Sequence, residues 1–529
     1  MRIGPCHWAC EAAALRLIVA RRVSALILAM FAVMIAAPAL AQTARFTEGA
    51  VAGSAQNGIA RFLGIPYAAP PVGPLRWAKP QPPRRWAGVR QAASFAPACR
   101  QTAAWITERQ SEDCLYLNIW APIQSGKTRL PVMVWIHGGG FFGGSGAQTL
   151  YDGTRLVRRG VIVVTLNYRL GIFGFFAHPE LTQRDHISGN QGLFDQIAAL
   201  RWIRRNIGAV GGDPRRVTIM GESSGSESVA ILTTSPLAAG LFQRAIAESG
   251  NDGIPLTGEE LADYDKAAAE MTGATFGRMI GRPTLSALRR APAEELLRQN
   301  WSPRTVVDGQ LIREDMTAAY REGRYNHVPL LLGWNSNEGV DLAPEIFGTN
   351  DFTTANYRPL VARLLRRPPP EAFLAAYPAG NDAEARSSLE RFTTDWWGWR
   401  MWAWAQLHRQ SPREGTYLYY FVHWPAEPSG RCGYGCKAGH GAEIPFALDQ
   451  LDQDKRAWNP DDRALSEQMA TYWTNFARTG NPNGPSVPRW VSFDGGEAGV
   501  LRLGTAEEIE TRGTLPAFAP LESLQPTRR

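Results

Sequence analysis

The sequence predicts an α/β fold with a large, mostly parallel central sheet and helices on both of its faces. Short runs rich in β-branched residues alternate with helical stretches along the chain. These runs are apolar at almost every position, which is typical of strands covered on two sides. No internal repeat is found in the sequence, which excludes solenoids and propellers. The runs are residues 131–136, 161–167, 217–220, 328–333 and 417–422.

Helical stretches complete this prediction. Apolar residues recur at helical spacing in Gln191–Asn206, between the second and third runs, and strand, helix and strand in this order predict a βαβ unit. Residues 261–298 and 391–410 are also rich in helix-forming residues, and neither stretch has a linker-like boundary. We therefore expect a single domain over residues 42–529 with helical excursions.

Composition and charge narrow the class of protein. The chain has 529 residues, of which 44% are hydrophobic and 20% charged, as in a globular protein. Lys and Arg number 56 against 49 Asp and Glu, which gives a net charge of +7. The basic residues are scattered singly or in pairs and form no stripe or tract, so we expect no nucleic-acid partner.

Residues 1–41 resemble a secretory signal peptide. Arginines up to Arg22 precede an apolar run at 23–37, and Ala39-Leu40-Ala41 forms a small-x-small cleavage site before Gln42. An uncleaved membrane anchor is the alternative, because the run approaches spanning length. Pro38 favours cleavage, and we expect a secreted or periplasmic protein. The mature chain would keep four cysteines in two close pairs, and this even number predicts two disulfides.

A nucleophilic serine is predicted at Ser223. The run 217–220 leads into Gly221-Glu222-Ser223-Ser224-Gly225, and a helix-compatible stretch follows. Strand, G-x-S-x-G and helix form a sharp turn that lifts the serine oxygen clear of the sheet at a helix N-terminus. The alternative is a glycine-rich turn with an idle serine, which the preceding buried strand makes the weaker interpretation.

A second glycine-rich turn predicts an oxyanion hole. The run 131–136 continues into His137-Gly138-Gly139-Gly140, whose backbone N–H groups are not screened by side chains. Gly138, Gly140 and Gly143 also match the dinucleotide pattern G-x-G-x-x-G, but no acidic residue lies about 20 positions further on. No Walker loop follows either. We therefore expect no cofactor.

The base and the acid of a triad must follow Ser223 in the order acid, then histidine. His440 lies in a flexible loop between two glycines, as a mobile imidazole requires. Glu338 follows the run 328–333, at the end of a strand where α/β active sites gather. Asp341 is the competing acid. Structural roles are expected for His408 and His423, and His327 precedes the strand and not the loop.

Several longer stretches give the chain a family resemblance. They are Phe62-Leu63-Gly64-Ile65-Pro66-Tyr67 with Pro70-Pro71, Ser111-Glu112-Asp113-Cys114-Leu115-Tyr116-Leu117-Asn118, Asn167-Tyr168-Arg169-Leu170-Gly171 and Gly211-Gly212-Asp213-Pro214. With these motifs, nearly the whole mature chain resembles the type B carboxylesterase family, the cholinesterase-like branch of the α/β hydrolases. The resemblance implies the α/β-hydrolase fold.

The resemblance also implies residue roles. Ser223 is the implied nucleophile, Glu338 the acid and His440 the base. The implied oxyanion-hole amides belong to Gly139, Gly140 and Ser224, with Glu222 and Ser249 as supporting residues. Ser224 replaces the usual Ala and Asn337 the usual Asp, and we expect neither departure to matter. The family implies a Cys99–Cys114 bridge, and Cys432 and Cys436 are candidates for a small bridge ahead of His440.

The implied reaction is hydrolysis of a small-molecule carboxylic ester through an acyl-enzyme, with no metal ion. Because attack needs neutral His440, the rate is expected to rise with pH through an ionisation near neutrality. Lactone, thioester or amide hydrolysis would use the same groups. A non-catalytic binding protein of this family would lack the nucleophile or the histidine, and this chain has both.

Aromatic residues give expectations about the charge of the substrate and the lining of its pocket. Trp105 is the only tryptophan of the segment 100–113, which we expect to be too short to cover an active-site gorge, so neutral esters are the predicted substrates. Phe141 and Phe142, beside the glycines, are candidates for lining a pocket. A cluster on an expected helix favours core packing, with pocket lining as the alternative. It contains Trp396, Trp397, Trp399, Trp402 and Trp404.

Overall fold

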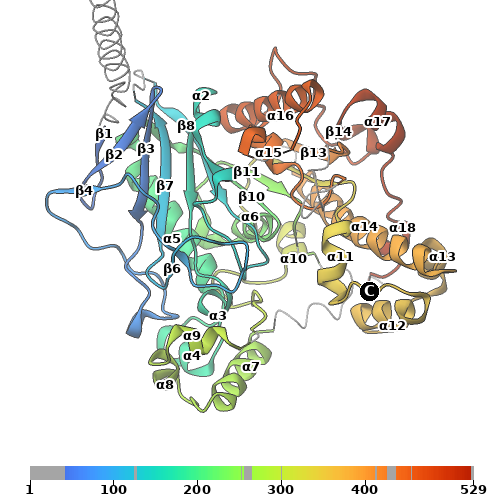
Figure 1. Ribbon diagram of the computed structural model, residues 1–529, viewed down its shortest axis with the longest axis horizontal. Coiled ribbons are helices and arrows are strands. Elements are labelled where there is room, and N and C mark those ends of the chain that lie inside the picture. The colour runs from blue at the N-terminus through green and yellow to red at the C-terminus, as the bar shows by residue number, and fades with distance from the viewer. Residues whose placement is uncertain are drawn as a thin grey trace, which may run out of the picture.

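A single large sheet runs through the protein (Figure 1). The computed structural model describes residues 42–123, 128–251, 253–254, 265–299, 301–411, 414–425, 437–453 and 456–525. The proposed signal peptide, Cys432 and Cys436 lie outside these residues. Across the sheet the strands are β1 (Gln42–Arg45), β2 (Ala50–Gln56), β3 (Ile59–Pro66), β7 (Tyr116–Pro122), β9 (Ile162–Leu166), β8 (Leu130–Ile136), β10 (Gly212–Glu222), β11 (Arg244–Glu248), β12 (Leu330–Asn335), β13 (Thr416–Phe421) and β14 (Val500–Leu503), with β4 (Val89–Gln91) beside β2.

The sheet is parallel from β9 to β14 and antiparallel from β1 to β9. The five predicted strands are β8, β9, β10, β12 and β13. The predicted helix is α5, with the expected bounds Gln191–Asn206. However, β9 and β10 are not neighbours, because β8 lies between them. Periodicity identifies strands but carries no information on their lateral order. The sequence analysis therefore could not predict that the connection from β9 to β10 passes over β8.

Helices cover both faces, as predicted. On β8, Val132 and Val134 join one apolar core, whereas Met133 and Trp135 join the other. This alternation explains why the strand sequence is apolar throughout. The first core includes α5, α6 (Ser224–Thr234) and α14 (Asp382–His408), and the second includes α2 (Thr154–Arg158), α15 (Ile444–Ala447) and α16 (Pro460–Thr479).

Helical excursions surround this frame. One of them packs α7, α8 and α9 against α4 around a small core of its own and forms the lobe at the bottom of Figure 1. Excursion helices are α3 (Gly171–Gly174), α4 (Pro179–Asp185), α7 (Lys266–Met279), α8 (Leu285–Arg289), α9 (Ala293–Leu297), α10 (Met316–Arg321), α11 (Gly339–Phe347), α12 (Thr354–Leu365), α13 (Glu371–Ala376), α17 (Ala506–Arg512) and α18 (Ala519–Glu522).

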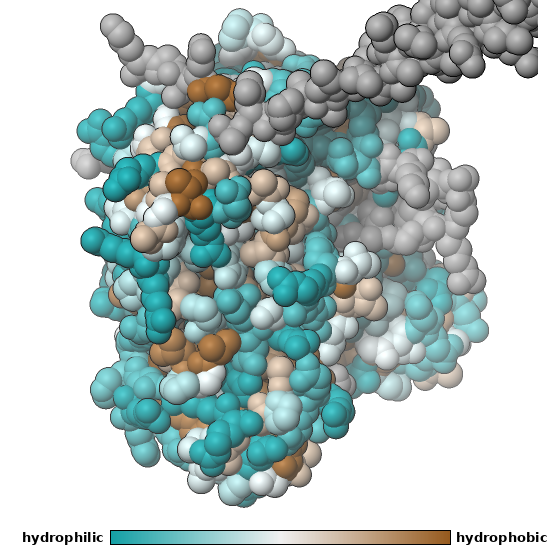
Figure 2. Space-filling view, turned by 60° about the vertical axis from the view of Figure 1, so that its left-hand side comes forward, coloured by the Kyte–Doolittle hydropathy of each residue, from teal (hydrophilic) through white to brown (hydrophobic). Residues whose placement is uncertain are grey.

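The visible surface is mixed in polarity. In Figure 2 apolar residues form small separate groups among hydrophilic ones on this face. Among the residues described, no helix is long and apolar enough to span a membrane. A two-stranded sheet of β5 (Ala98–Cys99) and β6 (Gln110–Ser111) lies beside the disulfide between Cys99 and Cys114, whose sulfur atoms are 2.02 Å apart.

A buried ionic bridge holds the end of β13 to two helices. His423 lies 2.6 Å from Asp462 of α16 and 2.8 Å from Glu508 of α17, one carboxylate at each ring nitrogen. Because carboxylates only accept hydrogen bonds, this geometry requires the doubly protonated imidazolium. Burial by itself lowers the pKa of His423, but its bonds to both carboxylates raise it above the ordinary value. The expected structural role of His423 agrees with this geometry.

Replacing His423 by Ala should lower the free energy of unfolding by about 3 to 5 kcal/mol, because two buried carboxylates lose their partner. Since the pKa is raised, this stabilisation should be complete below pH 6.5 and decline as pH rises through the raised value. Urea unfolding at pH 6 measures the loss. His327→Ala is the control, at a side chain that is 52% exposed and has a single carboxylate, that of Glu414, at 3.3 Å. A loss equal to that of the control would contradict the bridge.

Candidate active site

Ser223 stands on a sharp turn between β10 and α6. Its backbone has φ 58° and ψ −127°, a conformation that costs energy for a residue with a side chain. Two contacts hold the turn. The Ser223 N–H donates to the carbonyl of Glu248 at 2.9 Å. A Cβ atom at Gly225 would lie 2.1 Å from the carbonyl oxygen of Ile136, so only glycine lets α6 approach β8 this closely.

His440 and Glu338 meet beneath this turn. Nδ1 of His440 lies 2.7 Å from Oε2 of Glu338, although the two residues are 102 positions apart in sequence. The other carboxylate oxygen of Glu338 accepts a hydrogen bond from the Asn335 N–H at 2.8 Å. Both side chains are buried. Asp341, the competing acid, lies on α11 and lines the cavity. The geometry therefore favours Glu338 as the group that orients the imidazole.

A second carboxylate faces the other nitrogen of His440. Oε1 of Glu222 lies 3.2 Å from Nε2. Burial by itself lowers the pKa of His440, but the charges of Glu222 and Glu338 outweigh burial and raise the pKa above its ordinary value. Burial raises the pKa of Glu222 to about 7, with His440 opposing this shift and Glu338 adding to it. The imidazole is thus held between two buried acids.

The glycine-rich turn lies beside Ser223. Gly139, Gly140 and Ser224 line the same cavity as Ser223 and His440. The Ser224 hydroxyl accepts a hydrogen bond from the Phe141 N–H at 3.2 Å and so attaches this turn to α6. The sequence analysis missed this contact, because it treated the Ser224 side chain as interchangeable with that of alanine.

Behind the imidazole, Ser249 contacts an acid that the sequence analysis did not single out. Its hydroxyl donates to Oε1 of Glu443 at 3.4 Å, and Oε2 of Glu443 accepts from the side-chain amide of Asn335. Burial, and then the neighbouring acids, raise the pKa of Glu443 well above its ordinary value. The only available signal was its position three residues after His440. Among the described residues, no group of histidine, cysteine and acidic side chains is arranged to hold a metal ion.

The cavity above Ser223 has a volume of about 900 Å³. Trp397 of α14 lines it, with its indole N–H donating to the Ser249 carbonyl at 3.1 Å and its ring centroid 6.4 Å from that of His440. Phe141 and Phe142 line it as well, as expected. The other members of the tryptophan cluster pack in or against the core. Both interpretations of the cluster therefore apply: Trp397, near the middle of α14, lines the cavity and also packs against the core, whereas the other four tryptophans have only the packing role.

Trp105 also lines the cavity, so the segment reaches the site although it is short. Its ring lies 5.6 Å from that of Phe142 and is 56% exposed. The segment is drawn inward by Gln101, whose side-chain amide donates to and accepts from the backbone of Gly144, both at 2.8 Å. A short segment reaches the site because the bridge at Cys99 and this side chain bring it there.

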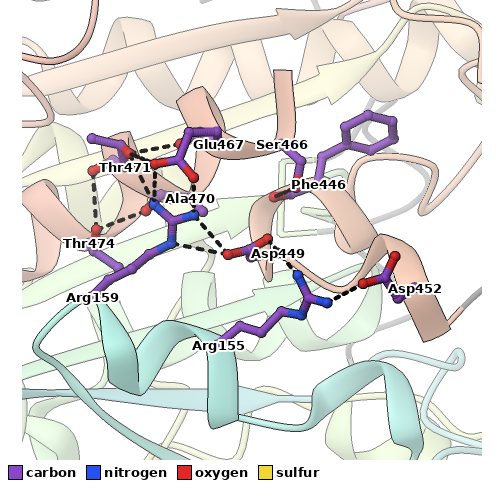
Figure 3. A network of polar contacts seen from close by, with 10 residues as sticks. All are labelled: Arg155, Arg159, Phe446, Asp449, Asp452, Ser466, Glu467, Ala470, Thr471 and Thr474. Carbon is purple, nitrogen blue, oxygen red and sulfur yellow. Dashed lines mark hydrogen bonds and ion pairs between the residues drawn. The ribbon is translucent and has the colours of Figure 1, made fainter. Parts of the chain in front are cut away.

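The segment that follows His440 is anchored by a polar network (Figure 3). Asp449, just after α15, lies 2.7 Å from Arg159, which also contacts Glu467 of α16 at 2.6 Å. Arg155 of α2 contacts Asp449 and Asp452. Because α15 contributes two cavity-lining residues, these ion pairs tie one wall of the cavity to α2 and α16.

The resemblance to known proteins extends over most of the chain. A family model described as "Carboxylesterase family" matches residues 40–517. The para-nitrobenzyl esterase of Bacillus subtilis (strain 168) is 38% identical over 485 residues, 87% of this chain and 94% of that protein. The fumonisin B1 esterase of Sphingopyxis macrogoltabida is 36% identical over 518 residues, 90% of this chain and 91% of that protein.

Solved structures agree. A PNB esterase superposes with a TM-score of 0.73 at 34% identity, covering 88% of this chain and 96% of its own. The Geobacillus stearothermophilus carboxylesterase EST55 also gives 0.73 at 34% identity, covering 85% of this chain and 93% of its own.

Replacing Glu222 by Gln should change the pH dependence of ester hydrolysis. Since His440 must be neutral to accept a proton and its pKa is raised, wild-type kcat/KM should rise with pH on the alkaline side of 6.5. Without the Glu222 charge, this rise should move to lower pH by about one unit or more. The measurement is the pH profile of kcat/KM with an uncharged ester. An unmoved profile would mean that Glu222 does not govern the ionisation of His440.

Proposed function

The chain belongs to the carboxylesterase family and is a carboxylic ester hydrolase, and we propose that Ser223, His440 and Glu338 form its catalytic triad. The observation that carries this proposal is the 2.7 Å contact between Glu338 and Nδ1 of His440, in a cavity that also contains Ser223. A carboxylate at Nδ1 keeps that proton in place and leaves Nε2 as the basic nitrogen.

The reaction then follows from these positions. Nε2 of His440 takes the proton of Ser223 as the hydroxyl attacks the ester carbonyl, and Glu338 stabilises the imidazolium that forms. The backbone N–H groups of Gly139, Gly140 and Ser224 are suited to bind the developing oxyanion. His440 next protonates the leaving alcohol. It then activates the water that hydrolyses the acyl-enzyme.

Supporting roles fall to residues that hold these groups. Glu222 faces Nε2 and sets the basicity of the imidazole. Ser249 contacts Glu443 through its hydroxyl and Trp397 through its carbonyl, and so connects the region behind His440 with the cavity wall. We further propose that residues 1–41 are a cleaved signal peptide and that the mature enzyme is exported.

We propose that the substrates are neutral esters with large groups. The volume of the cavity suits a drug-sized ligand, and aromatic side chains form part of its lining. The two curated relatives are named for esters of a fumonisin and of para-nitrobenzyl alcohol, which accords with a site for large groups. Charged side chains of both signs line the cavity: Arg304 and Arg456 disfavour a cationic substrate, whereas Glu227, Asp341 and Glu345, like the ring of Trp105, favour one.

Ser223→Ala should abolish ester hydrolysis without changing the fold, because loss of a triad nucleophile lowers kcat on the order of a million-fold. Turnover of para-nitrophenyl acetate by the purified variant, with circular dichroism as a check on folding, measures this. Ser387→Ala, at an exposed serine of α14, should keep wild-type turnover. More than about one percent residual activity in the folded Ser223 variant would contradict the assignment.

A choline ester should be hydrolysed no better than an uncharged ester of the same shape. Comparing kcat/KM for such a pair tests the proposed neutrality of the substrate. A tenfold preference for the choline ester, about 1.4 kcal/mol of transition-state binding, would contradict it. Loss of that preference in Trp105→Ala would then assign cation binding to the indole ring.

A further inference from the structure

Two glutamates lie side by side next to the proposed base. In the parallel pairing of β10 with β11, Glu222 is the register partner of Glu248. Register partners on neighbouring parallel strands point to the same face of the sheet, and such strands lie about 4.8 Å apart. Trp473 of α16 contacts Glu248 on this face. The two carboxyl groups therefore share one small region between the sheet and α16.

This row continues over the next two strands. Glu248 pairs with Gly333 of β12, and Gly333 pairs with Tyr419 of β13. A Cβ atom at Gly333 would lie 2.4 Å from the ring of Tyr419, so glycine makes room for the phenol. Tyr419 is fully buried, and its hydroxyl has no hydrogen-bond partner among the described residues. The row thus holds three ionisable side chains, those of Glu222, Glu248 and Tyr419, and none of them can carry a positive charge.

The surroundings of the two acids differ. Glu248 is 0% exposed, and one of its oxygens accepts a 2.8 Å hydrogen bond from the Trp473 indole. The other oxygen has no partner among the described residues. Burial of an unpaired carboxylate is far less favourable than burial of the neutral acid, and a like charge alongside adds to the difference. Glu222, in contrast, has Nε2 of His440 at 3.2 Å.

We propose that Glu222 and Glu248 share a single proton, that this proton resides on Glu248, and that Glu248 thereby acts as a positioning residue that fixes the negative charge on Glu222. The inference rests on the proposed function, because His440 matters here as the base. While Glu248 keeps its proton, Glu222 faces Nε2 of His440 as the one charged member of the pair. Loss of the proton adds a second negative charge, which favours the imidazolium that cannot accept the Ser223 proton.

The acidic groups near Glu248 act in the same direction. Glu443 approaches from the segment that follows His440, and Tyr419 from β13. Burial raises the pKa of Glu248 to about 8, with the Trp473 hydrogen bond opposing this shift and the Glu222 charge adding to it. These acids become more negative when they ionise and so disfavour a carboxylate at Glu248, whereas the imidazolium of His440, which faces Glu222, is the basic group that opposes them.

The first test measures unfolding and does not depend on catalysis. Glu248→Gln replaces the acid by a group that is always neutral. In the wild type, the unfolded chain releases the Glu248 proton at the ordinary pKa of a carboxyl group while the folded chain retains it, so stability falls as pH rises. From pH 5 to 7, the unfolding constant of the wild type should rise relative to that of the variant by about tenfold per pH unit.

Glu507→Gln, at an exposed glutamate of α17, is the matched control and should show no such pH-dependent difference. An equal pH dependence of wild type and Glu248→Gln would overturn the proposal, because Glu248 would then titrate as an ordinary carboxylate.

The second test is the pH profile of kcat/KM, which a merely structural role would not move. The ascending limb of the wild type should extend to higher pH than that of Glu248→Gln, because above about pH 8 the wild type gains a second negative charge near His440 that the variant cannot form. Glu507→Gln should match the wild type. Limbs that coincide above pH 8 would overturn the link between Glu248 and His440. If wild type itself does not hydrolyse esters, the proposed function fails, while the unfolding test still decides where the proton resides.

Infrared spectroscopy keeps the proposal testable if Glu248→Gln does not fold. Wild type at pH 7 should show the carbonyl band of a protonated carboxyl group, and absence of any such band would overturn the proposal. Trp473→Phe removes the hydrogen bond to Glu248 and should shift that band. A band that does not shift would place the proton on another acid, such as Glu443, and would likewise overturn it.

Discussion

The site depends on one imidazole that is removed from water and surrounded by acids. His440 is 1% exposed and has Glu338 at one nitrogen and Glu222 at the other. In a region of low polarity, such contacts are strong and directional, and an unpaired acid is correspondingly unfavourable. The surrounding scaffold meets part of this demand: an indole of α16 donates to Glu248, and an amide of Asn335 and the hydroxyl of Ser249 donate to Glu443.

The same chemistry appears away from the cavity with a different result. His423 also lies between two carboxylates, but none of these groups lines the cavity of the proposed active site. There the imidazolium is a permanent link between β13, α16 and α17. At His440 the imidazole must be neutral to accept a proton. The two neighbouring acids therefore control its pKa and do not serve as a permanent ion pair. The two histidines have the same kind of partners, two carboxylates each. They differ in that only His440 lines the cavity.

Local patterns in the sequence predicted the parts of the structure that local chemistry determines. The strands, α5 and the G-x-S-x-G turn at Ser223 are of this kind, because periodicity and small residues specify them directly. The lateral position of β8, the inward course of the segment with Trp105 and the place of Trp397 depend on contacts with remote residues. Glu443 was missed for the same reason, since its partners Asn335 and Ser249 come from other strands.

The division between sheet and excursions has an evolutionary consequence. The strands deliver Ser223 and the turn at Gly139, whereas α11, α14 and the segment between Cys99 and Cys114 add residues to the cavity wall. Insertions or deletions in those connecting segments would reshape the space around the ester while the reacting atoms keep their positions. Proteins with this scaffold can in this way differ in the esters that they bind while the same groups carry out the reaction.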